Sequence, residues 1–433
     1  MKRTKICAIA SVFIIIFFYI SFNVYHNNKK IEGLDLYSNN YIDTPLETIS
    51  LDELRSVYEE NVEEIKNGKY DNLSADNPVV TITQADSVCN IKETSNDWYK
   101  DVDMLELVEE ELGVIKQLIG EDINMDYVVD DTSWYYTDKR YNMHYPTYKE
   151  TVESIKTGTY TPNEVVASYC TYPYLAYTSN MSMSEDHRYC HVPCDLDYVV
   201  FIKGKFNKLL FDAGVEVEND LKIVGEYYKN GEGLEDEYEL LNGKISIKEA
   251  IDFVENFFEN KYPYNINKGV KQKVYKVRVY ELENGIYALQ FLLVREFNGL
   301  LTDWSDNSSG VDNEVLTYGT DSARVVMVEI NDIDMREGSG NAKRMQYVGN
   351  PITKVVSLDS ALEKISNSLG KNSKYKIEEI SMIFRRKIVN DTLYQQEYTG
   401  IPCWKIRCTN IADGRETRFY INLKDGKLEY YLS

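Results

Sequence analysis

The sequence predicts an α+β fold preceded by one transmembrane helix. An apolar run from Ile6 to Phe22 opens the chain, and no second run of that length follows. The rest alternates helical apolar stripes with short strand-like runs, and its C-terminal half shows one order of elements twice. Apolar residues make up 43% and charged residues 27%, as expected for a folded globular body.

The N-terminal segment fits a retained membrane anchor. Residues 6–25 are just long enough as a helix to cross a hydrocarbon core of roughly 30 Å. The cations in residues 1–5 favour a cytoplasmic tail. A cleaved signal peptide is the alternative, but Tyr19-Ile20-Ser21 lacks the small residue that such a site needs. We therefore expect a single-pass cell-membrane protein with a cytoplasmic N-terminus and an extracellular body.

The first part of the exported body is predicted as a stalk and one domain. Residues 26–44 are polar and predict a stalk, whereas residues 45–240 predict an α+β domain of unknown type. The expected helices cover residues 46–67, 103–119 and 148–155, and the expected strands or β-rich runs cover residues 79–84, 165–177 and 196–202.

Residues 245–350 are predicted to form one helix-plus-sheet repeat. Ser246 and Glu249 have the spacing of a capping box, and an apolar stripe at helical spacing follows them. Strands are expected at 274–282 and 286–295, joined by an Asn-Gly turn, and a further strand at 323–330.

Residues 351–433 repeat this order. A helical stripe follows Ser357, and strands are expected at residues 376–389, 403–408, 417–423 and 428–431. Both repeats contain a Glu-aromatic-x-Gly-aliphatic sequence, at Glu296–Leu300 and at Glu397–Ile401. A helix packed on a small antiparallel sheet would bury each stripe.

The second repeat carries motifs of a known kind. They are the sequence Ser-Leu-Asp-Ser-Ala-Leu-Glu-Lys-Ile from Ser357, an aromatic-Gly-Ile-Pro corner before Trp404, Phe-Tyr-Ile-Asn from Phe419, and Asp-Gly-Lys-Leu from Asp425. This pattern resembles PepSY-like domains and is similar to extracytoplasmic regulatory domains of the YycH and YycI type. The resemblance covers residues 245–433. It implies a non-catalytic role through protein contact or restraint of exported proteases.

Charge and composition restrict the partners. The formal net charge is −22, although the first thirty residues carry five cations and no acid. Such a body repels phosphate backbones, so we expect no nucleic acid partner. The 36 Tyr residues are interpreted as compositional bias, with an exposed tyrosine recognition surface as the alternative.

One short segment concentrates metal-type ligands. Four possible zinc ligands lie within eight residues: His187, Cys190, His191 and Cys194. The chain has only two further His residues, His26 and His144. The spacing departs from the usual two separated pairs. The alternatives are a disulfide of Cys190 or Cys194, or reduced thiols, and we assign no metal or other cofactor.

Other polar segments carry weaker signals. Cys403 and Cys408 should not bond each other, because five positions apart on a strand they point to opposite faces, whereas Trp404, Ile406 and Cys408 share a core face. An acidic loop is interpreted as solvated, with calcium binding as the alternative; it contains Asp303, Asp306, Asp312 and Glu314. The Gly-Ser-Gly sequence at residues 338–340 is interpreted as a turn.

These features predict a membrane-anchored extracytoplasmic regulatory module without catalysis that binds another membrane or exported protein, or a peptide. A sheet edge in either repeat would add a strand to that partner. The alternative is an exported hydrolase acting on cell-wall or peptide substrates, with residues 187–194 in its site. A third possibility is a structural surface component.

Overall fold

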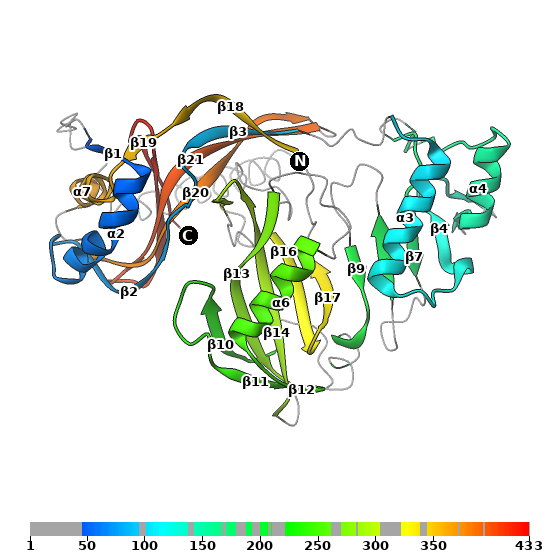
Figure 1. Cartoon of the computed structure of the whole chain (residues 1–433), viewed down its shortest axis with the longest axis horizontal. Coiled ribbons are helices and arrows are strands. Elements are labelled where there is room, and N and C mark those ends of the chain that lie inside the picture. Colours follow the sequence, from blue (N-terminus) through cyan, green and yellow to red (C-terminus); the bar gives the residue numbers. More distant parts are fainter. Residues whose placement is uncertain are drawn as a thin grey trace, which may run out of the picture. The chain divides into compact units, whose positions relative to one another are not determined.

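The computed structural model confirms the α+β class (Figure 1). The structure describes residues 46–94, 101–136, 143–164, 166–167, 170–178, 188–192, 200–206, 209, 221–260, 270–282, 285–303, 322–337, 344–370, 373–392 and 395–432. No helix within these ranges is long and apolar enough to cross a membrane. The anchor expected at residues 6–25 and the stalk at 26–44 lie outside the described residues.

The chain forms two compact units that do not follow its linear order. Unit 1 takes its residues from Met1–Ile82, Ile352–Met382 and Cys403–Ser433, and unit 2 from Thr83–Pro351 and Ile383–Pro402. The division runs through the stretch predicted as one domain from 45 to 240, because the strand at 73–81 pairs with a strand of the second repeat.

Unit 1 consists of helices packed on part of a sheet. Its elements are β1 (Thr48–Ser50), α2 (Leu51–Lys66), β2 (Leu73–Thr81), β19 (Lys354–Val356), α7 (Leu358–Ser368), β22 (Glu416–Asn422) and β23 (Leu428–Leu432), together with parts of β20 (Tyr375–Thr392) and β21 (Gln395–Asn410). Trp404, Ile406 and Cys408 of β21 are fully buried, which confirms the predicted core face. The Trp404 indole N–H donates to the Val356 carbonyl over 2.8 Å, so it fixes the strand that leads into α7.

The first helix starts later than the sequence predicts. We expected it from residue 46, but residues 48–50 pair with β19 and the helix begins at Leu51. The Ser50 hydroxyl caps it by accepting the Glu53 N–H over 3.1 Å. The prediction missed this short strand because its pairing partner lies about three hundred positions away in the sequence.

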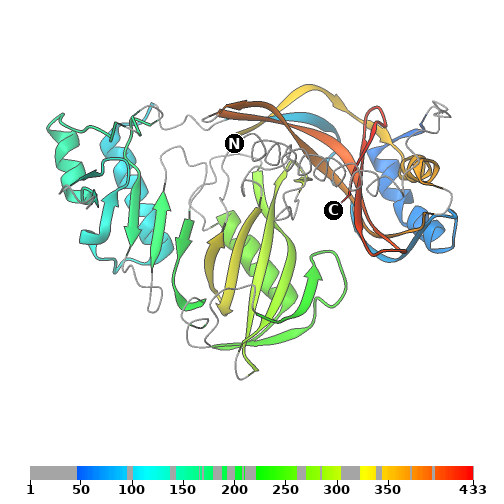
Figure 2. The ribbon, with the colours of Figure 1, turned by 180° about the vertical axis from the view of Figure 1, so that it is seen from behind.

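Unit 2 contains a second helix-covered sheet. Its elements are β3 (Val88–Thr94), β10 (Ile223–Tyr228), β11 (Glu237–Leu240), β12 (Gly243–Ser246), α6 (Ile247–Asn260), β13 (Val270–Glu281), β14 (Tyr287–Phe297), β15 (Leu300–Thr302), β16 (Ser322–Glu329), β17 (Asp332–Glu337) and β18 (Arg344–Ile352). Four strands pair antiparallel in the spatial order β13, β14, β16 and β17. Strand β10 pairs with the outer side of β13. Helix α6 lies across one face of this sheet (Figure 2).

A helical lobe of unit 2 carries the segment that held the zinc candidates. It comprises α3 (Met104–Ile119), the short 3-10 helix η2 (Met125–Tyr127), β4 (Val128–Asp130), β5 (Tyr135–Tyr136), β6 (Met143–His144), α4 (Tyr148–Lys156), β7 (Leu175–Thr178), β8 (Tyr189–Val192) and β9 (Val200–Ile202). Its sheet has the order β4-β7-β8-β9. The β-rich run expected at residues 165–177 is mostly wrong, because the Cys170 N–H bonds the Val166 carbonyl in a helical turn and only Leu175–Thr178 is strand.

The same order of elements occurs twice. Helix α6 precedes β13, β14, β16 and β17, and helix α7 precedes β20, β21, β22 and β23, in each case neighbours in an antiparallel meander. The predicted capping box of α6 is confirmed: the Ser246 hydroxyl accepts the Glu249 N–H over 3.2 Å, and the Glu249 carboxylate accepts the Ser246 N–H over 3.1 Å. A strand, a capping Ser and a helix also occur at Ser50, a third junction that the sequence analysis missed.

Candidate functional site

The structure does not bring the zinc candidates together within the described residues. Cys190 and His191 are consecutive on β8, so their side chains point to opposite faces of the strand. Cys190 lies in the hydrophobic core, and the His191 side chain is 12% exposed on the other face. No group of three or more His, Cys, Asp or Glu within the described ranges could hold a metal. His187 and Cys194 lie outside those ranges.

The described cysteines are buried, and none of them forms a disulfide with another described cysteine. They are Cys89, Cys170, Cys190, Cys403 and Cys408. Cys190 is therefore a reduced thiol and not half of a disulfide, and Cys403 and Cys408 do not bond each other, as predicted. Burial raises the pKa of the Cys190 and Cys408 thiols, which keeps them protonated and unreactive. Cys194 lies outside the described residues.

The remaining predicted polar segments are described only in part. His144 on β6 has its Nε2 3.9 Å from a Glu150 carboxylate oxygen and its ring centroid 4.9 Å from that of Tyr135. Asp303 donates its N–H to the Phe384 carbonyl over 2.9 Å. The rest of the acidic loop, the Gly-Ser-Gly turn at 338–340 and His26 lie outside the described residues, so the calcium alternative stays untested.

Two carboxyl groups are buried where the lobe's sheet meets α3. Glu111 of α3 is 1% exposed and Asp130 of β4 is fully buried. A Glu111 oxygen, Oε2, accepts the Leu175 N–H over 2.9 Å, and Asp130 Oδ1 accepts the preceding N–H, that of Tyr174, over 3.3 Å. The Thr132 hydroxyl also donates to Asp130 Oδ1, over 2.6 Å. The two carboxyls therefore hold consecutive amides at the start of β7.

The second oxygen of each carboxyl is buried and has no hydrogen-bond partner among the described residues. These oxygens are Glu111 Oε1 and Asp130 Oδ2. Burial raises the pKa of both groups, and for Glu111 the nearby Asp130 raises it further. Glu111 consequently favours its neutral, protonated form, because two buried like charges cannot both be ionised cheaply.

His191 lies beside Asp131 in the same lobe. Its Nε2 is 3.4 Å from an Asp131 carboxylate oxygen, and its ring centroid is 6.3 Å from that of Tyr174. Burial lowers the pKa of His191, while the Asp131 charge opposes that shift. Because Glu111 and Asp130 are closed off from solvent, the geometry fits them as structural clamps of β7 and not as groups that touch a substrate.

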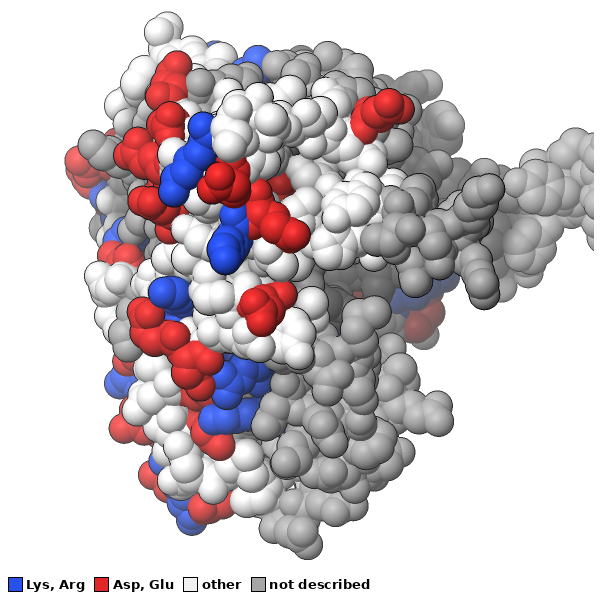
Figure 3. All heavy atoms as spheres, turned by 90° about the vertical axis from the view of Figure 1, so that its right-hand side faces the viewer, with Lys and Arg blue, Asp and Glu red and all other residues white. Residues whose placement is uncertain are grey.

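The outer face of this lobe is polar. Figure 3 shows acidic and basic side chains interspersed there, with acidic ones more numerous, in keeping with the net charge of −22. The accessible feature best suited to binding lies elsewhere in unit 2, at strand β10.

Strand β10 forms an exposed edge. Among the described residues it pairs with β13 and with no other strand. Ile223 is 46% and Val224 37% exposed, an unusual exposure for two adjacent aliphatic side chains on a strand. The register shifts between Ile223 and Gly225, so a β-bulge interrupts the ladder there.

The backbone of β10 leaves hydrogen-bonding groups pointing outward. The Lys222 carbonyl accepts the Glu281 N–H over 3.1 Å, and the Lys229 N–H donates to the Tyr275 carbonyl over 3.3 Å. In an antiparallel ladder the bonded pairs alternate, so Glu226 falls on a non-bonded pair opposite Arg278. Its N–H and C=O therefore point away from β13, toward the open edge.

Tyrosines surround this edge. The Tyr227 hydroxyl donates to Asp236 Oδ2 over 2.8 Å and is hydrogen-bonded to the Tyr238 hydroxyl. Ring centroids lie 5.1 Å apart for Tyr238 and Tyr287 and 5.6 Å apart for Tyr228 and Tyr275. All are partly exposed. The tyrosine cluster comprises two groups on opposite faces of the strand, Tyr227, Tyr238 and Tyr287 on one and Tyr228 and Tyr275 on the other.

Gly225 makes room for the tyrosine cluster. A Cβ at that position would lie 2.9 Å from Tyr227 Cε2 and 3.0 Å from the Tyr238 hydroxyl. A larger residue would therefore displace two aromatic side chains.

The sequence analysis missed this edge. It assigned no element between residues 202 and 240, although the run Ile-Val-Gly-Glu-Tyr-Tyr from Ile223 combines strand-forming residues and is followed by the turn glycines Gly231 and Gly233. That signal would have placed a strand. It would not have shown that the strand lies at an edge.

Comparisons with known proteins give distant structural similarity. No protein-family model matches the chain, and no curated protein matches it significantly. The structure of an uncharacterized protein from Eubacterium rectale ATCC 33656 aligns with 86% of this chain and 98% of its own, at 12% identity and a TM-score of 0.47. The Bacillus megaterium YpeB C-terminal domain aligns with 75% of this chain and 97% of its own, at 12% identity and a TM-score of 0.30. These values do not establish a family.

Proposed function

We propose that this protein is a non-catalytic regulatory module that binds an extended segment of another membrane or exported protein at the edge of β10. The open edge carries the proposal: an unpaired strand side, two exposed aliphatic residues and the tyrosine cluster occur together. An added strand gains main-chain hydrogen bonds from such an edge, and alternate side chains provide specificity.

The apolar residues at the edge give the partner a surface to bury. Exposed aliphatic side chains on an edge strand favour aggregation unless a partner covers them. Of the usual protections, Ile223–Tyr228 has a β-bulge but no proline, and its one charged residue, Glu226, is exposed. This composition favours an edge that is covered when the protein acts.

The location of the protein and the family of its C-terminal repeats are proposed as well. We propose that residues 6–25 anchor the protein in the cell membrane with its body outside, and that residues 245–350 and 351–433 are PepSY-like repeats. The repeated helix and four-strand meander supports the second point. An anchor would raise the effective concentration of the module near membrane partners. The hydrolase alternative places residues 187–194 in its site; of these, the described Cys190 and His191 face opposite sides of β8.

The test is cross-linking of the full-length protein in intact membranes, with the Glu226→Pro variant beside the wild type. Proline removes the outward N–H and blocks an incoming strand, and the preceding Gly225 tolerates the backbone that proline requires. We expect loss of a reproducible cross-linked partner.

The control is Glu226→Ala. Glu226 forms ion pairs with Lys276 at 2.6 Å and with Arg278 at 3.0 Å, and alanine removes them while keeping the N–H. We expect the alanine variant to retain the partner. Equal capture by the proline variant and the wild type would contradict strand addition at β10.

A further inference from the structure

We infer that the edge of β10 selects a basic, extended segment that also carries aliphatic residues. This inference rests on the proposed function and adds the chemistry of the partner. It is carried by the charges that surround the edge and by the exposed aliphatic side chains on it.

Acidic residues dominate the end of β10 and the turn that follows. Between residues 226 and 239 the acids are Glu226, Glu232, Glu235, Asp236, Glu237 and Glu239, and Lys229 is the only base. The Lys229 ammonium is already bound by Glu255 at 2.5 Å, so it adds no net positive charge to the edge.

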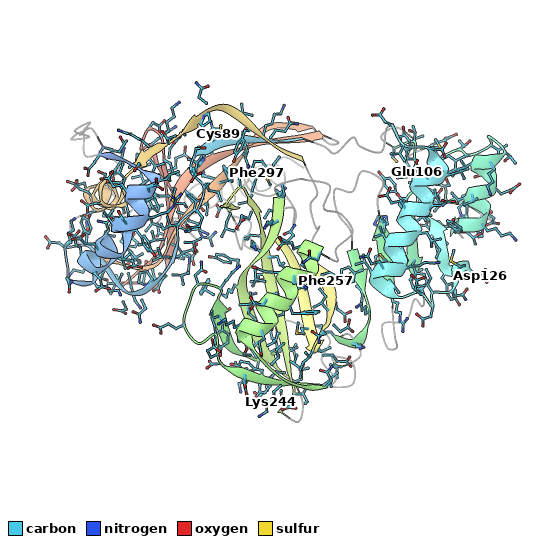
Figure 4. All side chains as sticks on the ribbon, in the orientation of Figure 1. Cys89, Glu106, Asp126, Lys244, Phe257 and Phe297 are labelled. Carbon is cyan, nitrogen blue, oxygen red and sulfur yellow. The ribbon has the colours of Figure 1, made fainter. Side chains whose placement is uncertain are left out.

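The ion pairs of the structure neutralise some of these acids but not all. Glu226 binds Lys276 and Arg278, and Glu239 pairs in register with Lys244 of β12. Lys244 is labelled in Figure 4. Glu232 and Glu237 are exposed and have no ion pair within the described part of the chain. They leave a negative potential that a cationic partner would satisfy.

The acidic turn is fixed to the edge strand. Asp236 Oδ2 accepts the Tyr227 hydroxyl over 2.8 Å, and the Asp236 carbonyl accepts the Ile247 N–H over 3.0 Å at the start of α6. The Asp236 carboxylate is therefore held against the C-terminal part of β10, and the turn that carries Glu232 and Glu237 is anchored on both sides of it.

The aromatic surface favours the same partner. The Lys276 ammonium lies 5.4 Å from the centroid of the Tyr228 ring, which shows that this ring face accommodates a cation. At the other end of the strand, Ile223 and Val224 are exposed and apolar. One extended segment can therefore place aliphatic side chains against this end of β10 and cations near the acidic turn at the other end.

The test measures binding of defined peptides to the full-length protein in nanodiscs of neutral lipid. One fluorescent peptide repeats Lys-Val four times, and its partner repeats Glu-Val four times. We expect the Lys-Val peptide to bind, the Glu-Val peptide to bind at least about tenfold more weakly, and Glu226→Pro to abolish binding.

Charge-neutral variants of the free acids test the residues named. Glu232→Gln and Glu237→Gln should each weaken Lys-Val binding about threefold and reduce its salt sensitivity. The control is Glu121→Gln, an exposed acid of the helical lobe, which should leave binding unchanged.

The outcomes separate this inference from the proposed function. If Glu226→Pro removes the natural partner but the two peptides bind equally, the edge site stands and its preference for basic segments is wrong. If Lys-Val binding survives Glu226→Pro, the peptide does not use this edge and the inference fails. Self-association of the full-length protein that Glu226→Pro abolishes would assign the edge to a second copy and overturn the inference.

Discussion

Replacing Glu111 by glutamine should remove one source of pH dependence from the helical lobe. The Glu111 carboxyl is buried against Asp130, and its Oε1 has no hydrogen-bond partner among the described residues. Glutamine keeps the shape and the oxygen that accepts the Leu175 N–H, and it carries no titratable proton. Glu111→Gln should therefore fold and hold β7 in place.

The magnitude follows from proton linkage. The folded state raises the pKa of Glu111 well above its ordinary value, so the closed lobe keeps a proton that the open lobe releases. The stabilisation is complete below the unfolded pKa of about 4.3 and is lost as the pH rises toward the folded pKa. Within that window opening becomes easier by about 1.4 kcal/mol, or tenfold, per pH unit.

The assay is hydrogen exchange of the β7 amides as a function of pH, corrected for intrinsic exchange. As the pH rises above about 4.3, the protection of the wild type should fall more steeply than that of Glu111→Gln, by at most about tenfold per pH unit. Asp130 also has a raised pKa, so it adds a pH dependence of the same sign to the wild type and to Glu111→Gln. Glu109→Gln, an exposed site on the same helix, should behave like the wild type. Identical pH dependence in the wild type and Glu111→Gln would refute the buried-proton argument.

Four further predictions concern stability and thiol chemistry. The Ser357 hydroxyl caps α7 by accepting the Ser360 N–H over 3.2 Å. Ser357→Ala removes this cap and should lower the free energy of unfolding in denaturant by about 1 kcal/mol. Gly400→Ala should cost about 1–3 kcal/mol because its Cβ would lie 2.5 Å from Ile91 Cγ1. Gly113→Ala, on a helix with open space around it, should instead stabilise by about 0.5–1 kcal/mol, so a drop in its melting temperature would count against the packing argument. The Cys190 thiol should resist alkylation in the native protein and react on unfolding, as read by mass spectrometry.

Local signals in the sequence predicted the helices and the C-terminal order well. Capping residues and apolar stripes depend on neighbours a few positions away, and α3, α4, α6 and α7 begin close to where those signals stand. Ser246 and Ser357 both cap helices as expected.

Pairing between strands far apart in the sequence was harder to predict. Strand β2 pairs with β20, so the N-terminal residues join a unit formed by the end of the chain. The buried contact of Glu111 with the Leu175 N–H likewise joins residues 64 positions apart. Nothing in the local pattern around Glu111 distinguishes it from its exposed neighbours Glu109 and Glu110, because burial depends on what packs against the helix.

The candidate site shows the same limit. The cluster from His187 to Cys194 attracted attention through its composition, yet consecutive positions on β8 send Cys190 and His191 to opposite faces. The edge at β10 carries ordinary residues and becomes distinctive only when its pairing is known.

The central claim is that a partner segment adds to the edge of β10. The most direct measurement places a photo-cross-linking residue at Val224 in the full-length protein in intact membranes and maps the attachment point on the partner by mass spectrometry. Ile411, a 59% exposed aliphatic residue in a turn of unit 1, serves as the matched position. The account predicts a Val224 product at one short segment, absent with Glu226→Pro and absent from Ile411. A Val224 product unchanged by Glu226→Pro, or no Val224 product at all, would contradict it.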